Sequence, residues 1–129
     1  MRLVQPIRTG MFAAALLAAC GEGAPQGASL PPDDFEKALA EGAQLVDVRT
    51  PEEHNEARLP GSRNLDWNAG ELQAAKDEID KGRPVLLYCA SGRRSAAARE
   101  YLTKEGFKDV RDLEGGIHAW IASGKPVVR

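Results

Sequence analysis

Short apolar segments that favour strands alternate with segments that favour helices along residues 30–122, and this alternation constrains the fold more than any other feature. The clearest strand runs from Pro84 to Tyr88, because its continuous apolar run is typical of a strand buried on both faces. The other strands are predicted at 44–48, 63–65 and 110–113. The predicted helices span 32–41, 51–57, 71–79, 95–105 and 116–122. Strands separated by helices indicate an α/β fold with a parallel sheet and helices on both of its faces.

The size and composition of the chain exclude several classes of protein. Its 129 residues allow one domain of ordinary size, and 43% hydrophobic with 28% charged residues is a globular composition. A formal net charge of −2 provides no basic surface, which argues against nucleic acid as a partner. The 2 cysteines are too few for a disulfide scaffold. No uncharged apolar run reaches the length of about 18 residues that would predict a membrane-spanning helix.

Residues 1–19 have the layout of a secretory signal peptide. Arg2 and Arg8 give a basic start without an acidic residue, and a short apolar stretch follows from Met11 to Ala19. The segment Leu17-Ala18-Ala19-Cys20 resembles a bacterial lipobox, in which the cysteine is lipidated and becomes the new N-terminus. The other interpretations are an ordinary signal peptide cut near Ala19 and a buried amphipathic helix.

These features predict an exported protein that a lipid on Cys20 anchors to a membrane of the cell envelope, on the periplasmic side in a cell with two membranes. Residues 20–29 are rich in small residues and predict a flexible tether to a domain at 30–129. In an oxidising compartment Cys20 and Cys89 could pair, but a lipid on Cys20 would prevent that disulfide. Cys89 would then be a lone thiol, which calls for a chemical role.

Cys89 is the first residue after the clearest strand, and it opens a short loop into a predicted helix. Ligands of open parallel sheets bind at the carboxyl ends of the strands. A tight loop that ends at a helix start turns its backbone N–H groups inward, and these groups, the helix dipole and two arginines all favour a thiolate. The candidate binding residues of the loop are Ala90, Ser91, Gly92, Arg93 and Arg94, with Ser95 in support.

Each of these assignments has a structural alternative. A lone cysteine is most often a buried structural residue, although the polar and basic neighbours of Cys89 favour a reactive thiolate. Arg93 could simply face water. Arg94 could form a structural ion pair with an acid such as Asp47.

Four segments of the chain, in order, resemble the motifs of the rhodanese-like family, and the resemblance covers nearly all of residues 30–128. The segments are 47–53 (DVRTPEE), 59–64 (LPGSRN), 88–95 (YCASGRRS) and 113–120 (LEGGIHAW). The position before Leu59 is often histidine in relatives and is Arg58 here. This departure has little consequence, because basic residues are common at that position.

The resemblance implies a three-layer α/β/α domain around a five-stranded, mainly parallel sheet. It also implies transfer of sulfane sulfur: Cys89 would take the outer sulfur of thiosulfate, hold it as a persulfide, and pass it to cyanide or a low-molecular-weight thiol. Asp47 and Arg49 are implied to support the loop by hydrogen bonds. No metal or other cofactor is expected, and His54 and His118 are expected at the surface rather than in a ligand cluster.

Two other functions stay open. The first is a sulfur-carrier or thiol-sensing module that holds a persulfide for a partner protein. The second is a phosphatase or arsenate reductase. The active-site loops of related phosphatases resemble the pattern Cys-x5-Arg, with five residues between the cysteine and the arginine. Here four residues separate Cys89 from Arg94, and the shorter loop leaves less room for a phosphoryl group. A phosphatase also needs a general acid, and none can be placed at the loop from the sequence. The natural donor, the acceptor and the oligomeric state stay open as well.

Overall fold

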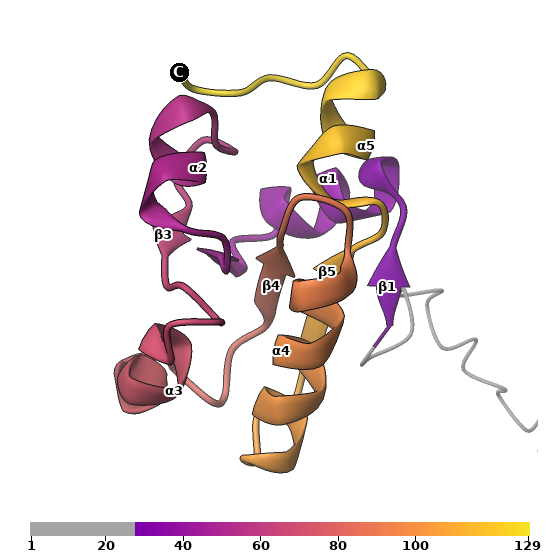
Figure 1. Ribbon diagram of the computed structural model, residues 1–129. Coiled ribbons are helices and arrows are strands. Elements are labelled where there is room, and N and C mark those ends of the chain that lie inside the picture. Colours follow the sequence, from indigo (N-terminus) through magenta and orange to yellow (C-terminus); the bar gives the residue numbers. More distant parts are fainter. Residues whose placement is uncertain (1–27) are drawn as a thin grey trace, which may run out of the picture.

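The computed structural model describes residues 28–129 (Figure 1). The signal peptide predicted at 1–19, the lipidation site Cys20 and most of the predicted tether lie outside the described residues. The strands are β1 (Ser29–Leu30), β2 (Gln44–Asp47), β3 (Arg63–Asn64), β4 (Val85–Tyr88) and β5 (Val110–Leu113). The helices are α1 (Pro32–Ala40), α2 (Pro51–Glu56), α3 (Glu71–Ala75), the 3-10 helix η1 (Lys76–Glu78), α4 (Arg93–Lys104) and α5 (Gly116–Ala122).

The strands form one sheet in the order β1-β5-β4-β2-β3, and every neighbouring pair is parallel. The central strand is β4, and all four of its residues are buried. Parallel pairing brings the carboxyl ends of the strands to one edge, where Asp47 lies beside Tyr88 and Leu87 beside Asp112. The predicted five-stranded α/β fold is therefore confirmed, and the sheet is parallel throughout residues 28–129.

Helices cover both faces of this sheet, which confirms the predicted three-layer architecture (Figure 1). Helices α3 and α4 cover one face, where the core includes Leu72, Ala75, Leu87, Ala98 and Leu102. Helices α1 and α5 cover the other face, where the core includes Phe35, Leu86, Ile117 and Trp120. Successive residues of a strand point to opposite faces, so Tyr88 enters the core beside α5 and Cys89 enters the core beside α4.

The first strand and the third helix differ from the sequence-based expectation. β1 was not predicted, because a strand of two residues has no period of its own and forms by pairing with β5. Ser29 therefore pairs with β5, although it lies inside the segment expected as tether. The helix expected at 71–79 is α-helical only to Ala75 and then narrows to the 3-10 helix η1.

The helix after Cys89 also begins earlier than expected. We predicted its start at Ser95, but α4 begins at Arg93. Gly92 precedes it in the left-handed region with φ 109°, where glycine has no steric penalty, and this turn allows the helix to start directly. Both arginines of the loop therefore lie in the first turn of α4.

The C-terminal segment runs from α5 across to the end of α2 (Figure 1). Backbone hydrogen bonds of 2.9 and 2.8 Å between Arg58 and Val128 hold it there.

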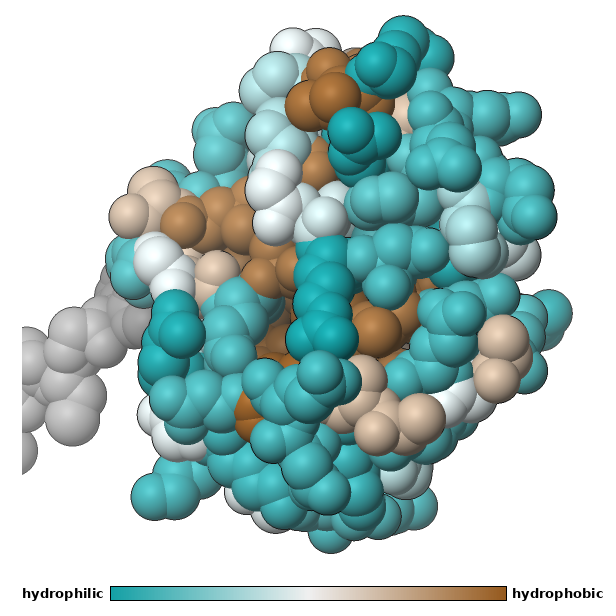
Figure 2. Space-filling view, turned by 90° about the vertical axis from the view of Figure 1, so that its left-hand side faces the viewer, coloured by the Kyte–Doolittle hydropathy of each residue, from teal (hydrophilic) through white to brown (hydrophobic). Residues whose placement is uncertain are grey.

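Of the large hydrophobic side chains in residues 28–129, only Ile121 and Val128 are exposed. Figure 2 shows the side of the molecule that lies on the left in Figure 1, where hydrophobic residues are visible between hydrophilic ones. Among residues 28–129 no helix has the length and apolar character needed to cross a membrane.

Candidate active site around Cys89

Cys89 lies where β4 ends and the loop to α4 begins, at the carboxyl edge of the sheet. The residue is 1% exposed, so its thiol lies at the floor of the loop. The backbone N–H of Gly92 donates to Cys89 Sγ at 3.1 Å, and the hydroxyl oxygen of Ser95 lies 3.5 Å from the same atom. The loop therefore closes around the sulfur, as the sequence predicts for a ring of inward amides.

These contacts change the acidity of the thiol. Burial raises the pKa of Cys89, because a charged sulfur loses its hydration. The backbone N–H groups of Ser95, Gly92 and Ser91 oppose the effect of burial, and so does the Ser95 hydroxyl, because each of them can donate a hydrogen bond to the charged sulfur. Their combined effect is larger, and the pKa of Cys89 is lowered below its ordinary value. A larger share of Cys89 is therefore thiolate, the nucleophilic form.

Helix α5 orients the peptide groups of this loop. The backbone N–H of Ile117 donates to the carbonyl oxygen of Cys89 at 2.9 Å, and that of His118 donates to the carbonyl oxygen of Ala90 at 3.2 Å. Amides in the first turn of a helix have no acceptor within the helix, so the loop satisfies them. Because the loop carbonyls face α5, the following N–H groups are free to face Cys89 Sγ.

Gly116 permits this close approach of α5 to the loop. It has φ +61°, and a Cβ atom there would lie 2.4 Å from the carbonyl carbon and oxygen of Ala90 and 2.5 Å from the carbonyl oxygen of Cys89. Both contacts are with backbone, which cannot rotate away as a side chain can. The Gly115-Gly116 pair is therefore more than a tight turn, since it allows α5 to hold the loop.

Arg94 is held by an ion pair from α2. Its Nη1 and Nη2 atoms each donate to one carboxylate oxygen of Glu53 at 2.9 Å. Glu53 also accepts from the backbone N–H of Thr50, and the Thr50 hydroxyl accepts from the N–H of Glu53, so the two residues form a capping box at the start of α2. The Arg94 hydrogen bonds, with smaller help from Thr50, lower the pKa of Glu53 to about 2 despite partial burial. Arg94 thus pairs with Glu53 rather than with Asp47.

Replacing Glu53 with glutamine is expected to remove a stabilising contribution that depends on pH. The pKa of Glu53 falls from 4.5 to about 2 on folding, so its contribution is complete above pH 4.5 and is lost as the pH falls through about 2. Glu53→Gln should lower the free energy of unfolding at neutral pH by about 1 kcal/mol, a partly exposed pair being screened by water. Urea unfolding from pH 2 to pH 7 measures this difference.

The matched control is Glu52→Gln, which changes an exposed acid in the same turn of α2. It should leave the low-pH part of the stability profile unchanged. A Glu53→Gln deficit of constant size from neutral pH down to about 2 would contradict the role given to the Arg94 pair.

The other residues of the loop differ in exposure. Ser91 and Arg93 are exposed at the rim, and Ala90 and Gly92 are partly buried. Within residues 28–129 the side chain of Arg93 forms no hydrogen bond or ion pair, whereas Arg94 is committed to Glu53. Arg93 is therefore the loop cation that is available to a small anion at the rim.

Asp47 and Arg49 lie at the carboxyl end of β2, on the same edge of the sheet as Cys89. Both are buried, and Arg49 donates through Nε and Nη2 to the two carboxylate oxygens of Asp47 at 3.0 and 2.8 Å. The hydroxyl of Tyr88 donates to Asp47 at 2.8 Å, and burial followed by the Asp47 charge raises the pKa of Tyr88 to about 12. Tyr88 directly precedes Cys89, so these residues brace the end of β4 rather than bond to residues 90–95.

His54 departs from expectation. We expected it at the surface, but its side chain is 16% exposed and its Nδ1 lies 2.9 Å from Asp47 Oδ2. The short helix α2 folds back over the end of β2, which brings the ring against this carboxylate. His118 is exposed, as expected.

Ser95 connects the thiol to a second buried carboxylate. Its hydroxyl donates to Asp112 Oδ2 at 3.2 Å, and both residues are almost completely buried. Neither Asp112 nor Glu53 was predicted from the sequence as a site residue. A signal was present for Asp112, because it is an acid between the apolar end residues of the predicted strand 110–113. For Glu53 the pattern Thr50-Pro51-Glu52-Glu53 indicates only a local role in capping α2, and it gives no sign of the contact with Arg94.

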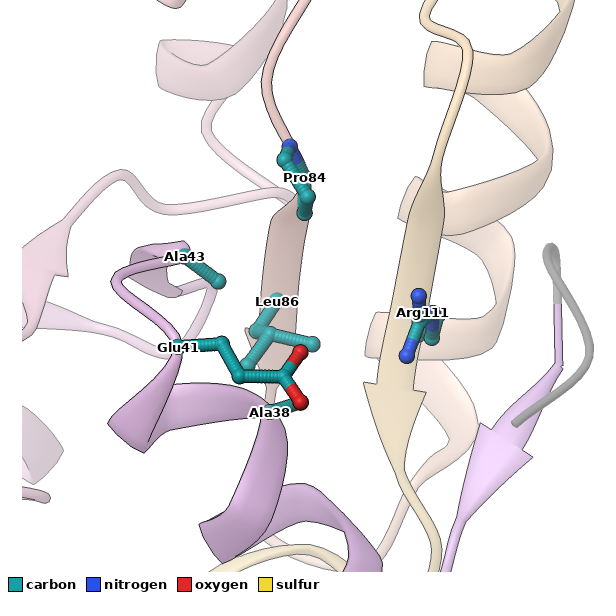
Figure 3. Close-up of a pocket in the computed structure, with 6 residues that line it drawn as sticks. All are labelled: Ala38, Glu41, Ala43, Pro84, Leu86 and Arg111. Atoms are coloured by element: carbon teal, nitrogen blue, oxygen red, sulfur yellow. The ribbon is translucent and has the colours of Figure 1, made fainter. Parts of the chain in front are cut away.

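A small pocket lies at the opposite edge of the sheet (Figure 3). Its lining residues come from the end of α1 and the loop after it, from β4 and the residue before it, and from β5: Ala38, Glu41, Ala43, Pro84, Leu86 and Arg111. A volume of about 20 Å³ holds no more than about one water molecule. Within the described residues no three His, Cys, Asp or Glu side chains gather as a metal site would require.

A buried cysteine directly after the central strand of a parallel sheet, with backbone N–H groups directed at its sulfur, defines a class of α/β/α proteins by fold and site geometry. The family comparison narrows this class. The sequence model of the rhodanese-like domain matches residues 31–123, and the chain therefore belongs to the rhodanese-like domain family.

Curated relatives and solved structures agree with this assignment. The chain is 40% identical over 91 residues to a sulfurtransferase of Allochromatium vinosum, covering 70% of this chain and 83% of the relative. It is 34% identical over 94 residues to the thiosulfate sulfurtransferase GlpE of Pseudomonas savastanoi pv. phaseolicola, covering 73% and 87%.

Among solved structures, a rhodanese-related protein from Thermoplasma volcanium superposes with a TM-score of 0.70 at 33% identity, covering 78% of this chain and 96% of that one. A protein of unknown function from Rhodopseudomonas palustris, described as a possible tyrosine phosphatase, superposes with a TM-score of 0.65 at 28% identity, covering 78% and 83%. The family shares one fold, so the choice between sulfur and phosphate chemistry depends on the site.

Proposed function

We propose that this protein is a sulfurtransferase that moves sulfane sulfur from an anionic donor, with thiosulfate as the best test donor, to a thiophile through a persulfide on Cys89. The family and the sulfurtransferase relatives support sulfur transfer in general. The observation that carries the finer proposal is the ring of N–H donors around a buried thiol whose pKa is lowered. A persulfide adds one sulfur atom to Cys89, and the N–H groups of this ring can donate hydrogen bonds to it.

The reaction runs in two displacements. The Cys89 thiolate attacks the outer sulfur of thiosulfate, a new S–S bond forms, and sulfite leaves with the electron pair of the bond that breaks. Cyanide or a thiol then attacks the outer sulfur of the persulfide, and the Cys89 thiolate leaves. The N–H groups of Ser91, Gly92 and Ser95 stabilise the sulfur anion at both stages. The two displacements balance in atoms and electrons without an oxidant, a metal or another cofactor.

Steady-state kinetics with thiosulfate and cyanide test this order of events. Two separate displacements require ping-pong kinetics, which give parallel lines in double-reciprocal plots. Intersecting lines would mean that both substrates bind together, and would overturn the persulfide as an obligatory intermediate. If the protein loads sulfur once but turns over slowly with small acceptors, the carrier-module alternative is favoured. 3-Mercaptopyruvate is the next donor to try.

Replacing Arg93 with alanine is expected to weaken the use of thiosulfate. Arg93 is the exposed loop cation, its side chain has no partner among residues 28–129, and the donor is a dianion. The loss of one charge at a solvated rim should raise the KM for thiosulfate by about tenfold, with a smaller change in kcat. Initial-rate kinetics at fixed ionic strength measure both quantities.

Arg83→Ala is the matched control, because Arg83 is an exposed arginine just before β4, at the opposite edge of the sheet. It should leave the KM for thiosulfate unchanged. Equal effects of the two substitutions would indicate that general charge, rather than a site at Arg93, governs donor use.

Phosphatase chemistry is less well supported by this site. A phosphatase needs a proton donor for the leaving alcohol, and Glu53, the acid paired with the loop arginine, has a pKa of about 2 and is ionised at neutral pH. Only four residues separate Cys89 from Arg94. Hydrolysis of p-nitrophenyl phosphate that is lost in Cys89→Ser would restore this alternative.

We also propose that the protein is exported and anchored by a lipid on Cys20, with residues 20–28 as the tether. The basic start, the apolar stretch and the lipobox carry this proposal. Cys20→Ala should abolish incorporation of radioactive palmitate in cells and leave sulfur transfer by the purified protein unchanged. Continued labelling of Cys20→Ala would contradict lipidation at this residue.

A further inference from the structure

The buried carboxylate of Asp112 has no role in the two displacements above. It is 1% exposed and lies on β5, next to the central strand. Its Oδ1 atom accepts from Arg99 Nη1 at 2.7 Å and from the Ser29 hydroxyl at 2.8 Å. Its Oδ2 atom accepts from the Ser95 hydroxyl at 3.2 Å. Asp112 is thus bound to an arginine on one side and to the residue that contacts the thiol on the other.

The Ser95 hydroxyl has one proton and three neighbouring acceptors. These are Cys89 Sγ at 3.5 Å, the Gly92 carbonyl oxygen at 3.3 Å and Asp112 Oδ2 at 3.2 Å. A carboxylate has no proton to donate, so Ser95 must be the donor in its contact with Asp112. While Ser95 donates to Asp112, it cannot donate to a Cys89 thiolate, and its oxygen can only accept from the thiol.

From this competition we propose that Asp112 is a positioning residue, which draws the Ser95 hydroxyl proton away from Cys89 and so limits how readily the Cys89 thiol ionises. When the thiolate forms, the hydroxyl turns toward Sγ and the carboxylate loses one of its donors. The stabilisation that Ser95 gives to the thiolate is therefore reduced by the bond it gives up. Asp112 acts on the nucleophile only through Ser95.

The other charged groups around the thiol either pair with a residue other than Cys89 or keep their charge when Asp112 is replaced. Arg94 on α4 lies in electrostatic reach of Cys89 and Asp66 and is bound to Glu53 of α2. The charge of Asp112 is met by Arg99 of α4 at 2.7 Å. On the remaining sides, β4 contributes Tyr88, whose hydroxyl bonds to Asp47, and α5 contributes the exposed His118. Arg93 is exposed at the rim.

Asp112→Asn tests the competition directly, because the surroundings determine which way the amide faces. Arg99 and Ser29 are both donors at the Oδ1 position of Asp112, so they select the amide oxygen of the new side chain. The amide NH2 must then face Ser95 and donate to its oxygen. Ser95 no longer gives its proton to position 112, and the proton becomes available to Cys89 Sγ.

The measurement is the rate of Cys89 alkylation by iodoacetamide between pH 5 and pH 10, read by peptide mass spectrometry, which separates Cys89 from Cys20. The midpoint of this profile should fall by about one pH unit in Asp112→Asn. The midpoint should rise in Ser95→Ala. The double variant Ser95→Ala/Asp112→Asn should match Ser95→Ala alone, because the residue that transmits the effect is absent.

The matched control is Asp109→Asn, which removes an acid paired with Arg111 at the other end of β5 and should leave the midpoint unchanged. An unchanged or raised midpoint in Asp112→Asn would overturn the proposal. An equal fall with and without Ser95 would also overturn it, since the effect would then be one of charge. If Asp112→Asn fails to fold, as judged by circular dichroism, Asp112→Leu removes the acceptor and should shift the midpoint in the same direction.

This inference deepens the proposed function, because it concerns the acidity of the proposed nucleophile. The two can fail separately, because alkylation requires neither thiosulfate nor an acceptor. An unshifted midpoint together with normal sulfur loading would remove Asp112 from the account and leave the sulfurtransferase in place. A shifted midpoint without any sulfur loading would keep the competition for the Ser95 proton and overturn the sulfurtransferase.

Discussion

Replacing Cys89 with serine is expected to abolish sulfur transfer and to leave the fold unchanged. The serine hydroxyl is close in size to the thiol but stays protonated at neutral pH, and so it cannot act as the attacking anion. Cys89 is 1% exposed in a closed loop, and an isosteric side chain keeps that packing. The kcat/KM for thiosulfate should fall below about a thousandth of the original value, since no other residue supplies the nucleophile.

Cys20→Ser is the control for this result, since it removes the other cysteine of the chain and should keep full activity in solution. Circular dichroism and thermal unfolding establish that Cys89→Ser is folded. A Cys89→Ser protein that is folded and still transfers sulfur at more than about a tenth of the original rate would refute Cys89 as the sulfur-carrying residue.

Gly116→Ala is expected to have the second largest effect, although the substitution adds only one methyl group. The new Cβ would lie 2.4 Å from backbone atoms of Ala90, so α5 and the loop must separate. That movement breaks the hydrogen bonds from Ile117 and His118 to the loop carbonyls and releases the amides that face Cys89 Sγ. Displacement of a catalytic loop by about 1 Å costs on the order of a hundredfold in rate, and we expect at least this loss. The free energy of unfolding should fall by about 2–4 kcal/mol, from overpacking and backbone strain together.

Gly124→Ala separates the two causes of that loss. Gly124 also has a positive φ of 75°, but no atom lies within 4 Å of the position of a new Cβ. It should show the backbone strain of about 1 kcal/mol and no loss of sulfur transfer. Similar activity losses in Gly116→Ala and Gly124→Ala would mean that strain alone, rather than contact with the loop, explains the effect.

The fold could be predicted from the sequence because its signals are local. The apolar run before Cys89, the capping box at Thr50 and the glycines after helices each specify an element within a few residues. Alternation of those elements then indicates a parallel sheet, which places Cys89 and Asp47 at one edge. The strand β1 escaped prediction because it depends on its partner β5 and not on a pattern of its own.

The detailed contacts of the candidate site could not be predicted, because each one joins residues far apart in the chain. Arg94 and Glu53 are 41 positions apart, and several acids in the sequence could have formed that pair equally well. Periodicity also does not reveal that α5 donates two amides to the loop, since this depends on how the helix docks. Ser95 and Asp112 meet only because α4 packs on β5.

The most direct test of the persulfide on Cys89 is the intact mass of the purified Cys20→Ser chain before and after incubation with thiosulfate. In that chain Cys89 is the only cysteine. We predict a gain of the mass of one sulfur atom, its removal by cyanide, and no gain when Cys89 is also replaced by serine. A folded chain with an alkylatable Cys89 that gains no mass from thiosulfate, from 3-mercaptopyruvate or from a persulfide donor would contradict sulfur transfer through this residue.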